Sequence, residues 1–253
     1  TFTESVTIPD QVNLNMPNST LVGVFTFGNS NIHVDKVYAL NSSDTTITKS
    51  GTGDTFFRAN LFDLRGTAGT KTGVIGLFND TEGGVIYADI RRAIGGANST
   101  LARDGNTDTA WGQIFYHGDD IVLAGNAAEA FRMRANGSLF VVDVGRIRES
   151  GTPSGTIAFA FNSSNTPTMR ASVEQISVDI AWETLGTASL FLVCPSITGT
   201  KNGAANFDLT ALSFYSFAEY DLADGDDDIP AGSIALITGT ATADVAFTIG
   251  DGT

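Results

Sequence analysis

The sequence predicts an all-β fold of antiparallel strands, either a β-sandwich or a jelly roll. Short runs of β-branched and aromatic residues recur along the chain between clusters of Gly, Asn, Asp or Ser, a pattern typical of strands joined by turns. Several of these runs alternate apolar and polar residues, as half-buried antiparallel strands do. Hydrophobic residues make up 42% of the chain and charged residues only 17%, so a core is available and Thr, Ser, Asn and Gly must cover much of the surface.

The alternation is clearest in residues 173–182, where four residues share one face of the predicted strand: Ile176, Val178, Ile180 and Trp182. We therefore expect Trp182 to lie in the core. Residues 127–135 are the best helical candidate, with one or two turns, although a loop would fit equally well. The predicted strands, in order, are 1–8, 21–27, 34–40, 56–64, 74–78, 85–90, 114–116, 121–123, 139–144, 157–161, 173–182, 190–193, 207–217, 234–237 and 244–250.

Two short segments recur about half a chain apart. Residues 39–45 resemble residues 160–166, and the tripeptide at 66–68 recurs at 186–188. An internal duplication would produce this pattern. We therefore predict two tandem related β-sandwiches, residues 1–125 and residues 126–253, with a single large β domain as the alternative.

Composition also restricts function. A net charge of −14 disfavours direct contact with nucleic acid, because phosphate contacts require Lys and Arg. No run approaches the ~20 apolar residues of a membrane span. His33 and His117 lie far apart and in none of the familiar catalytic motifs, so we expect no enzymatic activity. Cys194 lies in an apolar run, which predicts a buried, unreactive thiol.

Two acidic loops could hold calcium, which is the only cofactor that the sequence suggests. Asp104, Asn106 and Asp108 alternate like the opening of a calcium loop, but Thr109 and Phe115 depart from the EF-hand pattern that follows. A solvated turn is the alternative. The second loop concentrates carboxylates that a hard cation would stabilise: Asp224, Asp226, Asp227 and Asp228.

Exposed ligand sites are also predicted. Trp111 follows the first acidic loop and could form a small platform for a sugar ring. In an exported protein, six Asn-x-Ser/Thr sequons would be glycosylation sites: Asn18, Asn41, Asn79, Asn98, Asn136 and Asn162.

The chain resembles β-rich structural proteins of virions, both jelly-roll capsid subunits and decoration or spike proteins. The resemblance lies in Thr-, Ser-, Gly- and Asn-rich strands, few Lys and a single Cys. It implies a non-enzymatic protein, located in a virion or outside the cell, that self-assembles and contacts other assembly proteins. Two alternatives remain open: a secreted filament, pilus-like or surface-layer subunit joined by strand exchange, and an extracellular carbohydrate- or receptor-binding module.

Overall fold

The computed structural model describes residues 2–79, 81–105, 112–162, 167–185, 188–203, 217–221 and 234–238. All regular elements in these ranges are strands. They are β1 (Phe2–Ile8), β2 (Asn13–Phe27), β3 (Asn31–Ala39), β4 (Thr45–Lys49), β5 (Asp54–Asp63), β6 (Ile75–Asn79), β7 (Val85–Gly95), β8 (Thr100–Asp104), β9 (Gln113–Leu123), β10 (Glu129–Met133), β11 (Leu139–Glu149), β12 (Ile157–Asn162), β13 (Thr168–Leu185), β14 (Ser189–Val193), β15 (Ser196–Gly203), β16 (Phe217–Asp221) and β17 (Ile234–Thr238).

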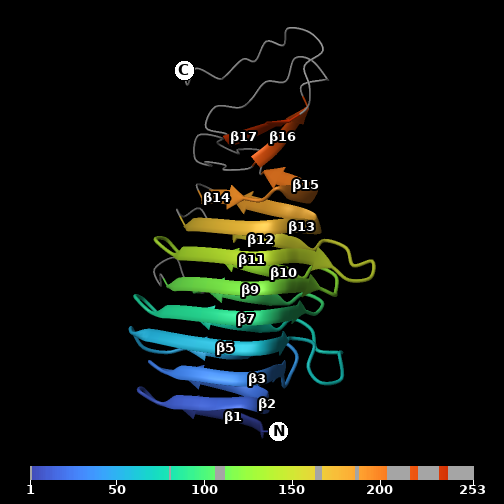
Figure 1. Cartoon of the computed structure of the whole chain (residues 1–253). Coiled ribbons are helices and arrows are strands. Elements are labelled where there is room, and N and C mark those ends of the chain that lie inside the picture. The colour runs from blue at the N-terminus through green and yellow to red at the C-terminus, as the bar shows by residue number, and fades with distance from the viewer. Residues whose placement is uncertain are drawn as a thin grey trace.

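The first fifteen strands form one sheet, in which neighbouring strands run parallel and stack as successive coils of a solenoid (Figure 1). The prediction of antiparallel sandwiches or a jelly roll is therefore wrong, although the all-β class is confirmed. The alternation that suggested antiparallel strands has another cause here. A solenoid strand also turns one side to the core and the other to solvent. β16 and β17 form a separate two-stranded parallel sheet.

Each full coil has three flat segments separated by bends. β13 contains all three: residues 168–173 pair with β11 and β14, residues 175–177 pair with β11 and β15, and residues 180–185 pair with β12 and β15. We call the three stacks of segments face 1, face 2 and face 3 in that order. In the earlier coils, face 1 and face 2 lie on one long strand, such as β7 or β9, and face 3 lies on the next, such as β8 or β10.

The interior of the coils is one continuous apolar core. Phe131 and Phe159 occupy neighbouring coils of face 3 with ring centroids 6.0 Å apart, and Tyr116 meets Phe131 edge-on at 5.2 Å. Trp182 and Cys194 are buried, which confirms the predicted burial of both side chains. Burial raises the pKa of the Cys194 thiol, so its thiolate is scarce at neutral pH.

The helical candidate at residues 127–135 is wrong, because it contains β10. Phe131 and Met133 lie on this strand and are fully buried. The strand pairs in parallel with β8 and β12. These ladder bonds and the burial of the two side chains outweigh the high helix propensity of an Ala-rich segment, because propensities differ by less than about 1 kcal/mol per residue.

The predicted boundary between residues 125 and 126 lies between β9 and β10, which belong to the same sheet. The division into two domains stays a prediction. No helix in the described ranges is long and apolar enough to span a membrane.

Candidate functional site

Face 1 carries two parallel rows of outward-pointing side chains along the solenoid axis. The rows are set by in-register pairing of successive coils, so that one residue from each strand adds one position to a row. The first row is Asn13, Asn31, Phe56, Tyr87, Phe115 and Val141. The second row is Asn15, His33, Arg58, Asp89, His117 and Asp143.

Three aromatic rings of the first row form a continuous stack. The ring centroids of Phe56 and Tyr87 are 4.7 Å apart, with an angle of 9° between the ring planes. Those of Tyr87 and Phe115 are 4.9 Å apart, with an angle of 16°. These spacings match the ~4.8 Å between neighbouring strands, so the rings lie one above another along the axis. Within the stack they cover each other's faces and present their edges to solvent.

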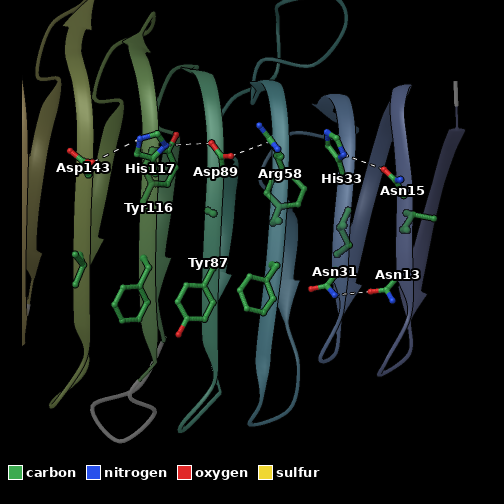
Figure 2. Close-up of a pocket in the computed structure, with 17 residues that line it drawn as sticks. Asn13, Asn15, Asn31, His33, Arg58, Tyr87, Asp89, Tyr116, His117 and Asp143 are labelled. Atoms are coloured by element: carbon green, nitrogen blue, oxygen red, sulfur yellow. Dashed lines mark hydrogen bonds and ion pairs between the residues drawn. The ribbon is translucent and has the colours of Figure 1, made fainter.

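The second row is a chain of surface ion pairs and hydrogen bonds (Figure 2). Arg58 Nε lies 3.2 Å from Asp89 Oδ2. His117 lies between two carboxylates, with Nδ1 3.4 Å from Asp89 Oδ1 and Nε2 3.9 Å from Asp143 Oδ2. Because these side chains are half or more exposed, each ion pair contributes at most about 1 kcal/mol to stability. The row therefore offers polar contacts to a ligand more than it holds the fold together.

The two rows line a shallow groove of about 720 Å³, a size typical of ligand sites. The first row is apolar from Phe56 to Val141 and carries amides at Asn13 and Asn31, whereas the second row offers imidazole, guanidinium, carboxylate and amide groups. This arrangement suits non-covalent binding of a ligand that combines an apolar surface with hydrogen-bonding groups. His33 and His117, which are remote in sequence, lie in the same row because face 1 recurs in every coil.

Sequence reasoning missed the aromatic stack. A weak signal was present: Phe56-Phe57-Arg58, Tyr87-Ala88-Asp89 and Phe115-Tyr116-His117 each place an aromatic residue two positions before an ionisable one. The first and third residues point outward while the middle one enters the core. The spacing between these tripeptides is irregular, because the loops that complete each coil differ in length.

Asp104 is buried and stabilises the backbone near the end of β10. It is fully buried and accepts hydrogen bonds from the backbone N–H groups of Arg134, at 2.6 Å, and Ala135, at 3.0 Å. Burial is the largest influence on this carboxyl and raises its pKa. Its oxygens thus satisfy two backbone N–H groups of the bend after β10, and a calcium ion would have to compete with these two donors for the carboxylate.

The remaining predicted ligands lie outside the described residues: Asn106, Asp108, Trp111, Asp224, Asp226, Asp227 and Asp228. The calcium and Trp111 predictions therefore stay predictions. In the described ranges, no group of three or more His, Cys, Asp or Glu side chains is arranged to hold a metal ion.

The sequons fall into different environments. Asn18, Asn41, Asn98 and Asn136 are exposed, whereas the side chain of Asn162 lies outside the described residues. Asn79 is fully buried, and its Nδ2 donates to the backbone oxygens of Gly84, at 2.8 Å, and Gln113, at 3.0 Å. In the folded protein this amide is inaccessible to a glycan.

Comparison with known proteins adds no identification, since no family model, no curated protein and no solved structure matches the chain.

Proposed function

We propose that this protein is a non-enzymatic structural component, of the virion spike or decoration class, that self-assembles through the N-terminal end of its solenoid. The observation that carries the proposal is the apolar, incompletely covered core at that end. A solenoid buries its core by stacking coils, so the uncovered side of the first described coil needs a cover, from a further chain segment or from a partner. A second copy of the chain would supply that cover here.

The first coil shows this incomplete burial directly. Leu14 and Met16 of β2 are only half-buried, although they pack against the core. Their partners one coil further in, Ile32 and Val34, are 2% and 0% exposed. The same interior rows are therefore closed inside the solenoid and open at its end.

The backbone at this end supports the same proposal. β1 pairs in parallel with the second half of β2, residues 21–27, and residues 13–16 of β2 pair with β3. In the part of the chain that the structure describes, no strand pairs with the outer edge of β1 or with the outer edge of residues 13–16. Unpaired strand edges next to apolar side chains are the usual route to strand addition between subunits.

The proposal is tested by measuring self-association with sedimentation velocity and light scattering over a range of concentrations. We expect concentration-dependent oligomers. The double variant Val6→Thr/Val12→Thr keeps the shape of two half-buried side chains at this end but replaces one methyl group of each with a hydroxyl. We expect it to weaken self-association about tenfold or more.

Val141→Thr is the matched control, because Val141 lies on the side of the solenoid and is also partly exposed. Circular dichroism melting must show that all three proteins fold. A wild-type protein that stays monomeric up to about 1 mM would overturn the proposal, and so would equal weakening by the control. Open filaments in electron micrographs would instead favour the secreted-filament alternative.

A further inference from the structure

We propose that face 1 holds a binding subsite for a neutral pyranose sugar, at the step between the asparagine pair Asn13–Asn31 and the aromatic ring of Phe56. This function does not depend on assembly through the N-terminal end. It adds a ligand and a site to the chain, on the side of the solenoid.

The step is the end of the aromatic stack. One face of the Phe56 ring is covered by Tyr87. The other face points along the axis toward Asn31, the in-register partner of Phe56 on β3. Within the described residues no aromatic ring stacks on that side, and Phe56 is 48% exposed. Its outer face is therefore the free end of the stack.

The floor of the step consists of the polar side chains of Asn13 and Asn31, which a hydrogen bond holds in place. Asn31 Nδ2 donates to Asn13 Oδ1 at 2.7 Å, so the amide nitrogen of Asn31 faces the first coil and its oxygen lies on the side away from Asn13 (Figure 2). Asn31 Oδ1 can still accept, and Asn13 Nδ2 can still donate. Beside these asparagines, in the second row, His33 Nδ1 and Asn15 Oδ1 form a hydrogen bond of 3.2 Å.

This combination matches the chemistry of a neutral sugar. A pyranose has an apolar C–H face that packs on an aromatic ring, and hydroxyl groups around its edge that both donate and accept hydrogen bonds. The amides of Asn13 and Asn31 offer both kinds of partner without a charge. The nearest charged groups in the second row, Arg58 and Asp89, form an ion pair with no net charge, so this pair does not favour an ionic ligand over a neutral one.

The groove extends beyond the step, along the rest of the aromatic stack as far as Val141. Beyond Phe56, however, the rings present edges, which cannot stack on a sugar. We therefore propose that one terminal sugar of a glycan binds at the step, against the free face of Phe56. The sugars that follow it would contact the ring edges along the rest of the aromatic stack.

The experiment is binding to an array of neutral, acidic and sulfated oligosaccharides. Saturation-transfer NMR and titration with the best neutral glycan follow. We expect binding to neutral glycans with a dissociation constant near the millimolar range. Phe56→Ser should weaken it about tenfold, because the ring face is lost, and Asn31→Ala should weaken it severalfold.

Val193→Ser is the control, because Val193 is another exposed large apolar residue on face 1 and lies on β14, away from the step. It should leave binding unchanged. Three results would each overturn the proposal: no neutral glycan bound at about 10 mM, binding confined to acidic or sulfated glycans, or equal binding by wild type and Phe56→Ser. Sedimentation of the same variants reports self-association separately, so failure of the assembly proposal is distinguishable from failure of this one.

Discussion

Asp120, on face 2, is a carboxylate surrounded by three arginines, and its neutralisation gives a sharp test of the electrostatics of this solenoid. Arg148 binds it through two hydrogen bonds of 2.9 and 3.0 Å. Arg92 and Arg146 are its in-register partners in the coils on either side, and each Nε lies 3.5 Å from a carboxylate oxygen. Hydrogen bonding to Asp120 raises the pKa of Arg148, so the guanidinium stays charged.

The expected cost of Asp120→Asn follows from burial and from the number of partners. The Asp120 side chain is only 10% exposed, and removing one partner of a buried ion pair costs about 3–5 kcal/mol. The three arginine side chains are 35–53% exposed, so solvent screens part of their mutual repulsion. We therefore expect a loss of about 2–3 kcal/mol in the free energy of unfolding.

The measurement is urea unfolding followed by circular dichroism, at low salt and in about 1 M NaCl, where the Debye length is about 3 Å. The penalty should shrink in high salt, because repulsion among the uncompensated arginines is screened. Asp119→Asn is the control, since it removes the same charge from a side chain that is 64% exposed and pairs with Arg91. It should cost less than about 1 kcal/mol. Equal costs for the two variants would refute the reasoning.

Three further predictions concern single buried groups. The buried Tyr116 hydroxyl has no hydrogen-bond partner among the described residues, so Tyr116→Phe should leave the free energy of unfolding unchanged or raise it by up to about 2 kcal/mol in urea titrations; a loss above about 1 kcal/mol would contradict this. Burial raises the pKa of Glu129 from its ordinary 4.5. The folded state then binds this proton more tightly than the unfolded state, and stability falls as pH rises from about 4.5 to the raised value. Unfolding measured across this pH range should show a shallower fall for Glu129→Gln, and an unchanged slope would count against the assignment. In folded protein from a glycosylating host, peptide mass spectrometry should find Asn79 unmodified and exposed Asn98 modified; a glycan on Asn79 would show that its burial is wrong.

Much of the strand content was predictable, and the direction of pairing was not. Alternation in residues 173–182 correctly indicated a strand, and Trp182 is buried as expected. The predicted face is interrupted at the register shift around Ile180, which is half-buried while Ala181 is buried. The same alternation arises in an antiparallel sandwich and in a parallel solenoid, because in both folds each strand has one side facing solvent and one side facing the core. Sequence repeats would distinguish them, but here loops of unequal length separate the coils and no fixed period survives.

The site was less predictable than the strands. Phe56, Tyr87 and Phe115 carry no unusual sequence pattern individually, and the sequence-based sugar platform was Trp111, which lies outside the described residues. Their importance comes from stacking at one position of three successive coils. Asp104 shows the converse case, because its loop resembled a calcium loop whereas its carboxylate caps a bend.

By itself, the sequence determined that the chain is acidic, β-structured and able to bury a large apolar core. These properties depend on composition and on local alternation, which each strand carries within its own few residues. Only the tertiary structure decided that the strands run parallel in stacked coils. It also decided which outward residues meet in rows, because a row is made of residues from different coils, and their register depends on how many residues each intervening loop contains.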